Sequence, residues 1–317
     1  MKKRALIVGI NYTGTGNVLK GCLNDAENMR VLLASRGFTE IKSVLEKEAT
    51  TEGIKAGLNW LIADTAPGDV IVFHYSGHGS QLPSSSEADG FEEIICPVDL
   101  NWLDKVITDN TLREVFDKVP NGVNTTLVLD CCHSGTMLDQ NESLNGTKEV
   151  KPSKPTKGSR YLKPPAKIKK QLANRTLVNW ETSKDVNATA LLIAGCHANQ
   201  TSADAFIDGK AQGAATASLI AATSTNTLIS YRNLTNEMVN YMSKNKYKQV
   251  PQLDGAESLY DQIFLEPFSF AVPAEPVVPV IDTAAGPVVE PSANNNMKPL
   301  LIIGAVIALI VLFLVFG

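Results

Sequence analysis

The stretch DVIVFHYSGHG, residues 69–79, begins as a nearly continuous apolar run and ends in small residues. The stretch TTLVLDCCHSG, residues 125–135, repeats this pattern. Short, β-branched, continuous apolar runs are typical of strands that are buried on both faces of a parallel sheet. Because functional sites in such sheets form outside the carboxyl ends of the strands, the residues that follow the two runs are expected to converge.

A histidine and a cysteine follow the two predicted strands, and together they suit a nucleophilic thiol enzyme. A free thiol has a pKa of ~8.5 and is mostly protonated at neutral pH, so a base must generate the reactive thiolate. His78 is the stronger candidate for the base because flanking glycines allow a substrate backbone to approach. His74 and His133 are weaker candidates. Cysteine is often buried for structural reasons, and we interpret Cys131 in this way.

These residues resemble the two catalytic motifs of metacaspases, the caspase-related cysteine peptidases that cleave after Arg or Lys. The matching segments are Tyr75-Ser76-Gly77-His78-Gly79 and Asp130-Cys131-Cys132-His133-Ser134-Gly135. The separation of 54 residues (132 − 78) also fits the caspase arrangement. Residues 4–12, 19–26 and 194–205 match further family segments, so the resemblance extends over about residues 4–265. The chain resembles in particular the type I metacaspases, but without a long N-terminal prodomain.

The resemblance implies roles for individual residues. Cys132 would attack the scissile carbonyl, and His78 would act as general base and then protonate the leaving amine. The backbone N–H groups of Gly79 and Cys132 would stabilise the oxyanion. The substrate-binding pocket would contain Cys22, Asp25, Ser76 and Asp130. Two carboxylates attract a basic side chain and repel an acidic one, so cleavage after Arg or Lys is expected.

Many metacaspases require calcium, and the resemblance implies a partial calcium site. The acidic positions of the family fall on Glu92, Thr108, Asp109 and Asp139. Glu92 can still coordinate calcium, but Thr108 supplies no charge. The metal ligands expected here are therefore Glu92, Asp109 and Asp139, with calcium stimulation as the outcome. A solvated acidic surface is the alternative interpretation.

Strands alternate with helices along the chain, which indicates a three-layer α/β sandwich with a mainly parallel central sheet. The apolar fraction of 44% over 317 residues is sufficient for a core. Residues 189–194 and 41–44 are further strand candidates. The helix candidates are residues 24–33, 51–62, 213–223 and 234–244. The caspase-like peptidase domain is expected to span residues 1–266.

A basic, proline-punctuated segment interrupts this domain at about residues 145–185, and it is densest in Lys and Arg over residues 148–175. Its composition predicts an exposed or disordered loop rather than a nucleic-acid arm. A peptidase that prefers basic residues could cut itself in this loop, so we expect self-processing there.

The C-terminal region predicts a membrane anchor. Residues 267–298 have the composition of a flexible linker. Residues 299–317 follow, and the 17 residues 300–316 carry no charge, which is at the short limit for a bilayer-spanning helix. A buried core helix is the alternative. Lys298 favours a cytosolic location for the preceding domain.

Location and partners follow from the remaining composition. The apolar run after Met1-Lys2-Lys3-Arg4 is short and predicts a strand rather than a signal peptide. Five cysteines without metal-ligand spacing suit a reducing compartment. The net charge of −4 indicates no nucleic-acid partner. The sequence therefore predicts a single-pass tail-anchored protein with a cytoplasmic catalytic domain, and the family resemblance implies a monomer.

Two classes of function remain open. The first is a membrane-tethered cysteine endopeptidase that cleaves after Arg or Lys. The second is a membrane-anchored caspase-fold scaffold whose pocket binds partners with little proteolysis. The presence of both His78 and Cys132 with both pocket carboxylates favours the enzyme. Caspase-type specificity for Asp conflicts with Asp25 and Asp130.

Overall fold

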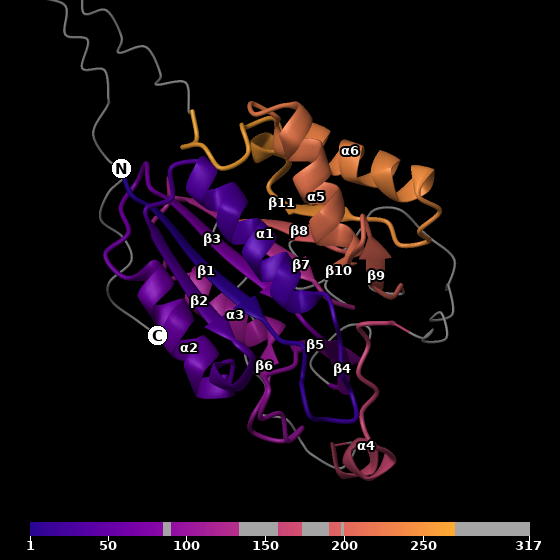
Figure 1. Ribbon diagram of the computed structural model, residues 1–317. Helices are drawn as coiled ribbons and strands as arrows, with labels where there is room; N and C mark the ends of the chain where they lie inside the picture. Colours follow the sequence, from indigo (N-terminus) through magenta and orange to yellow (C-terminus); the bar gives the residue numbers. More distant parts are fainter. Residues whose placement is uncertain (85–89, 133–157, 173–189, 198–199, 270–317) are drawn as a thin grey trace, which may run out of the picture. The chain divides into compact units, whose positions relative to one another are not determined.

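A six-stranded sheet forms the centre of the computed structural model, which describes residues 1–84, 90–132, 158–172, 190–197 and 200–269 (Figure 1). The strand order is β11-β8-β7-β3-β1-β2. Every neighbouring pair is parallel except β11 with β8. The strands are β1 (Lys3–Gly9), β2 (Glu40–Leu45), β3 (Val70–Ser76), β7 (Asn124–Asp130), β8 (Ala190–Ala194) and β11 (Gln252–Gly255). They belong to a compact unit that spans Met1–Phe270.

Helices cover both faces of this sheet, as Figure 1 shows. One face packs against α1 (Cys22–Ser35), α5 (Ala214–Thr225) and α6 (Tyr231–Lys244). The other face packs against α2 (Thr51–Ile62) and α3 (Asp109–Phe116). Strands β1, β3 and β7 are consequently buried at every residue, which is why the middle of each is mostly apolar rather than alternating. The predicted three-layer sandwich with a mainly parallel sheet is confirmed.

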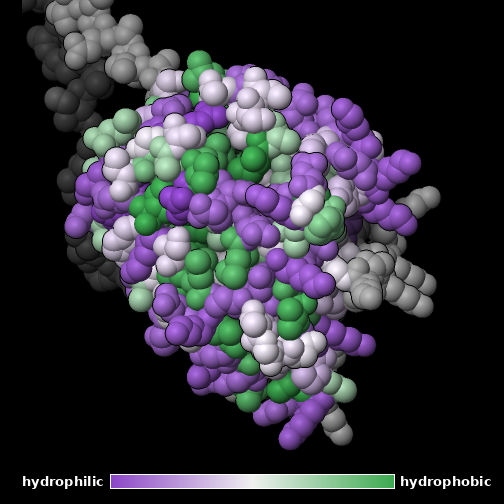
Figure 2. Space-filling view, viewed as in Figure 1, coloured by the Kyte–Doolittle hydropathy of each residue, from purple (hydrophilic) through white to green (hydrophobic). Residues whose placement is uncertain are grey.

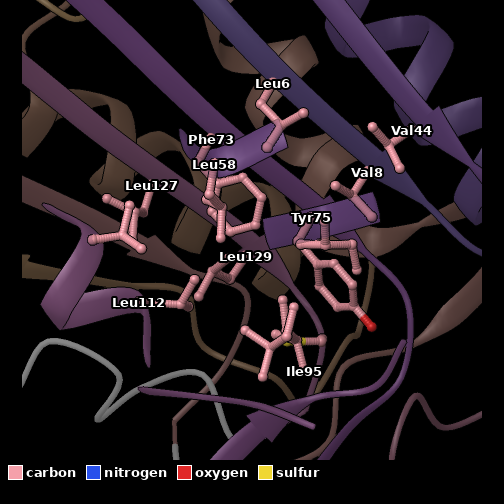
Figure 3. Close-up of a cluster of buried hydrophobic side chains, with 14 of the residues drawn as sticks. Leu6, Val8, Val44, Leu58, Phe73, Tyr75, Ile95, Leu112, Leu127 and Leu129 are labelled. Carbon is pink, nitrogen blue, oxygen red and sulfur yellow. The ribbon is translucent and has the colours of Figure 1, made fainter. Parts of the chain in front are cut away.

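The larger core lies between the sheet and α2 and α3. In Figure 3, Leu6 and Val8 of β1, Phe73 and Tyr75 of β3, and Leu127 of β7 lie side by side in this cluster. Leu58 contributes from α2 and Leu112 from α3. The outer surface in the view of Figure 2 is mixed, with separate apolar groups among hydrophilic ones. The core therefore fixes the sheet, and the sheet fixes the loops at its carboxyl edge.

Smaller elements surround that edge. A three-stranded sheet contains β4 (Gly79–Pro83), β5 (Phe91–Ile95) and β6 (Ile107–Thr108), and a hairpin contains β9 (Asp204–Ile207) and β10 (Lys210–Gly213). Helix α4 (Ala166–Leu172) and the short 3-10 turns η1 (Glu46–Glu48) and η2 (Glu257–Leu259) complete the elements.

The register of the central strands aligns their carboxyl ends. Gly9 of β1 pairs with Ser76 of β3, and Ser76 pairs with Asp130 of β7. Since the strands are parallel and neighbours, the residues immediately after them leave the sheet at the same place. His78 and Cys132 each lie two residues beyond such a strand end.

The structure bears on two expectations, the exposed basic loop and the C-terminal membrane anchor. The expected exposed loop is wrong for residues 158–172, because Arg160 is fully buried, Pro164 is buried and residues 166–172 form α4. The linker and the apolar span of residues 300–316 lie outside the described residues. Among the residues that are described, no helix has both the length and the apolar character needed to cross a membrane.

Candidate active site

Cys132 lies in the loop after β7, and its Sγ is surrounded by polar groups. The backbone N–H of Ser202 donates to Sγ at 3.1 Å, and the hydroxyl of Ser159 lies 3.8 Å from it. Burial raises the pKa of the Cys132 thiol to about 12, although these hydrogen bonds oppose the shift. The thiol is therefore protonated at neutral pH in this arrangement. Its neighbour Cys131 is fully buried within the larger core.

His78 lies in the loop after β3 and is held in a defined orientation. Its Nε2 lies 2.8 Å from the carbonyl oxygen of Asn17. A carbonyl can only accept, so Nε2 carries the hydrogen and Nδ1 retains its lone pair. Nδ1 makes no hydrogen bond to any of the described residues. Burial lowers the pKa of His78, against the opposing effect of nearby backbone carbonyls, so the ring is neutral and able to accept a proton.

The backbone around His78 is fixed by two buried tyrosines. Tyr12 accepts a hydrogen bond from the backbone N–H of His78 at 3.0 Å, and its ring lies 4.7 Å from the imidazole. Tyr75 donates to the carbonyl oxygen of His78 at 2.7 Å. Gly79 then passes so close to the Cys132 loop that a β-carbon would clash with the carbonyl oxygen of Cys132. The loops after β3 and β7 are therefore in direct contact, as the sequence predicts.

A deep acidic pocket adjoins these loops and contains the guanidinium of Arg160. Arg160 Nη2 lies 2.7 Å from Asp25 Oδ2 and 3.3 Å from Asp204 Oδ1, and Nη1 lies 2.9 Å from Asp130 Oδ1. The side chains of Arg160, Asp25 and Asp130 are fully buried. The three carboxylates thus surround the planar, forked guanidinium with acceptors of opposite charge.

The pocket carboxylates are positioned by backbone and hydroxyl donors. Asp25 accepts hydrogen bonds from Gly213 N–H at 2.9 Å and Ser76 Oγ at 2.7 Å. Burial raises the pKa of Asp25 to about 6, against the opposing effect of Arg160. Asp130 Oδ2 accepts from the N–H and the hydroxyl of Thr216, both at 2.8 Å. Thr216 lies in the first turn of α5, where the helix dipole favours a negative charge.

The segment that carries Arg160 crosses the site in an extended conformation. Its upstream part pairs with residues 202–204, because Arg160 N–H donates to Ser202 O at 3.0 Å and Asp204 N–H donates to Gly158 O at 2.7 Å. Gly79 N–H donates to the carbonyl oxygen of Arg160 at 2.9 Å. Gly79, the residue expected to stabilise an oxyanion, thus donates to the carbonyl of Arg160 itself.

Gly79, the neighbour of His78, donates to the Arg160 carbonyl and lies against the backbone of Cys132. Asp25, Ser76 and Asp130 surround the Arg160 guanidinium. Cys22 is also fully buried there, and burial raises its pKa to about 12. Sequence reasoning assigned no role to Arg160, Ser202 or Asp204. Asp204 lies within the matched segment 194–205, so that segment was the available signal, whereas nothing distinguishes Arg160 locally from its many basic neighbours.

The residues expected to hold calcium lie apart from this pocket. Glu92 is in β5 and Asp109 begins α3, and Asn110 Nδ2 donates to Glu92 Oε1 at 3.3 Å. Thr108 caps α3 by accepting from Thr111 N–H at 3.0 Å. Asp139 lies outside the described residues. Among the described residues, no group of three or more potential ligands is assembled.

The chain is similar in sequence to known metacaspases. Residues 3–141 match the model of the metacaspase peptidase C14 domain. The chain is 32% identical to Metacaspase-3 of Trypanosoma brucei brucei over 82% of its own length and 73% of the relative, and 32% identical to Metacaspase-1 of Meyerozyma guilliermondii over 80% and 70%. A crystal structure of a Geobacter sulfurreducens protein is similar with a TM-score of 0.62 and 25% identity, covering 85% of this chain and all of that one.

A more distant structure shares the fold. Caspase-1 of Spodoptera frugiperda is similar with a TM-score of 0.52 and 13% identity, over 83% of this chain and 88% of that chain. This likeness supports the caspase-like architecture of the described sheet and helices.

The burial of Cys132 beneath residues 158–162 generates a first prediction. Arg160→Ala removes the ion pairs that hold the segment, so the thiol is expected to become exposed and its pKa to fall toward ~8.5, the value of a free thiol. Alkylation of Cys132 by iodoacetamide at pH 7, followed by mass spectrometry, should accelerate at least about tenfold. Lys163→Ala, an exposed change in the same segment, is the control, and equal rates in the two variants would contradict the prediction.

Proposed function

Since this chain belongs to the metacaspase family of cysteine peptidases, we propose that it is an endopeptidase that cleaves polypeptides after arginine or lysine. The observation that carries the proposal is the placement of Arg160. Its guanidinium occupies the pocket formed by Asp25, Asp130 and Asp204, and its carbonyl accepts a hydrogen bond from Gly79. Residues 158–162 are therefore bound as a substrate would be.

The proposed reaction uses the thiol of Cys132 and the imidazole of His78. Nδ1 of His78 takes the thiol proton, and the thiolate attacks the carbonyl carbon of the basic residue. The oxyanion accepts a hydrogen bond from the N–H of Gly79. Collapse of the tetrahedral intermediate then breaks the C–N bond as His78 returns the proton to the leaving amine. Water, activated by His78, then hydrolyses the thioester and regenerates the thiol. The carbonyl of Asn17 accepts from Nε2 of His78 and so keeps Nδ1 free of hydrogen, which is the tautomer that these proton transfers require.

Charge explains the proposed specificity. The buried carboxylates of Asp25 and Asp130 are supported by N–H groups and by the start of α5, so they remain acceptors for a cation. Arginine can bridge both with its fork, whereas lysine reaches them with one ammonium group. An aspartate in the substrate would meet two like charges in a buried pocket.

Calcium stimulation is a further part of the proposal. Asn110, which follows Asp109 in the chain, donates a hydrogen bond to Glu92. Glu92 and Asp109 carry the hard carboxylate oxygens that calcium prefers. With Asp139 they would form the ligand set. Thr108, at the fourth expected position, uses its Oγ1 to cap α3. With so few ligands, calcium is expected to bind weakly.

Matched fluorogenic peptides that end in Arg, Lys or Asp test the function. Wild type should hydrolyse the Arg and Lys peptides but not the Asp peptide, and added calcium should increase the rate. Cys132→Ala should abolish turnover, and Asp130→Asn should lower kcat/KM for Arg by at least about 100-fold because a buried charged partner is lost. Asp109→Asn should reduce only the calcium response. Absence of Cys132-dependent turnover would support the scaffold alternative, and cleavage after Asp would refute the pocket assignment.

Self-processing is proposed at the bond between Arg160 and Tyr161. Incubation with calcium followed by mass spectrometry should detect a new N-terminus at Tyr161. Arg160→Ala should remove this cut because an alanine side chain cannot reach the carboxylates, while Lys167→Ala on exposed α4 should leave it intact. Cys132→Ala should remain uncut. A wild-type chain that stays intact under conditions where it hydrolyses the Arg peptide would exclude self-processing at this bond.

Membrane tethering through residues 299–317 is also proposed, on the uncharged sequence of residues 300–316. The full chain should float with phospholipid vesicles and resist alkaline carbonate extraction, because a spanning helix is released only by detergent. A chain that ends at residue 270 should remain in the soluble fraction. Recovery of the full chain in the soluble fraction, apart from the vesicles, would contradict the anchor. It would also contradict the proposed orientation with a cytoplasmic catalytic domain.

A further inference from the structure

The segment that contains Arg160 continues past the bond to Tyr161 and remains bound to the enzyme. Leu162 N–H donates to the carbonyl oxygen of Gly79 at 3.0 Å, and residues 161 and 79 form a parallel β-bridge. Gly79 thus holds the chain on both sides of the bond, through its N–H upstream and through its carbonyl downstream. The downstream contact adds nothing to oxyanion stabilisation, so it serves binding.

Tyr161 is half-buried, and from Leu162 to Pro165 the residues alternate between more buried and exposed positions. Leu162 is half-buried and packs against the larger core cluster, whereas Lys163 is exposed. Pro164 is buried and Pro165 is exposed. This alternation is that of an extended chain with one face on a surface. The next apolar contact is Ile168 of α4, which also packs against the cluster.

The element that receives this chain is β4, residues Gly79–Pro83. Helix α4 contacts β4, and Figure 1 shows it next to that part of the molecule. Leu82 of β4 is buried in the same cluster against which Leu162 and Ile168 pack. The surface of β4 therefore presents backbone groups at Gly79 and an apolar region further along. We refer to residues 79–83 as the downstream surface.

We propose that the downstream surface determines specificity by selecting polypeptides with an apolar residue at the second position after the cleaved bond. This inference rests on the proposed function and extends it to residues that the basic pocket does not contact. An aliphatic side chain at that position is removed from water against the core, whereas a carboxylate there would lose hydration without a partner. The occupant seen here is the chain's own segment from Tyr161 to Ile168.

Self-cleavage provides the first test. Leu162→Asp should slow the appearance of the N-terminus at Tyr161 by about tenfold, since a partly buried leucine side chain loses its contact with the core. Lys163→Asp introduces the same charge at the adjacent exposed position and should cut at the wild-type rate. Both variants should hydrolyse a short amide substrate that ends in Arg and has no residues beyond the bond. Equal self-cleavage rates in the two variants would overturn the proposal.

Cleavage in trans provides a second test in which one enzyme meets both substrates, so that no difference in folding between variants enters the comparison. Two internally quenched peptides, Gly-Ser-Arg-Tyr-Leu-Lys-Pro and its counterpart with Asp in place of Leu, are compared with Leu162→Asp as the enzyme. The Leu peptide should have an about tenfold higher kcat/KM, with the difference in KM. Equal values would refute selection by the downstream surface. Loss of all hydrolysis, including that of the short Arg substrate, would instead refute the proposed function.

Discussion

Three buried carboxylates share one guanidinium, and the site depends on this balance of charge. Asp25, Asp130 and Asp204 all contact Arg160, which comes from a segment distant from each of them in sequence. Removing one partner from a buried ion pair costs about 3–5 kcal/mol, because the remaining charge is left uncompensated. Gly213 and the start of α5 donate to two of the carboxylates but add no full positive charge. When Arg160 leaves, another cation is therefore favoured in its place, and the same interaction accounts for docking and specificity.

The central sheet holds these charged groups close together. Ser76 and Asp130 are paired neighbours at the ends of β3 and β7, while Asp25 enters from the first turn of α1. A shift of these strands by one residue would exchange their side chains between the two cores, each of which is packed for the side chains that it now holds. The register thus holds the carboxylates together despite their repulsion. It also holds His78 beside Tyr12 and Tyr75, whose hydroxyls bind its backbone.

The sequence alone predicts the strands, the layers and the convergence of His78 with Cys132, because continuous apolar runs and loop residues are local signals. Arg160 illustrates what local signals cannot provide. Its segment is basic and rich in proline, and such composition normally indicates a solvated chain. Burial of a single arginine depends instead on carboxylates at positions 25, 130 and 204, which only the folded structure brings together. Leu162 likewise depends on the backbone of Gly79 at the start of β4, which composition does not reveal.

The two sides of the bond after Arg160 are held by different forces, and this difference bears on product release. In the proposed reaction, hydrolysis converts the Arg160 carbonyl into a carboxylate, which adds a negative charge near Asp25, Asp130 and Asp204. That repulsion weakens the upstream product while the guanidinium still attracts it. The downstream product gains an ammonium group at Tyr161, but its contacts through Leu162 and Ile168 are apolar and unaffected by the new charge. Upstream release is therefore controlled by charge, and downstream release by the apolar area in contact with the core.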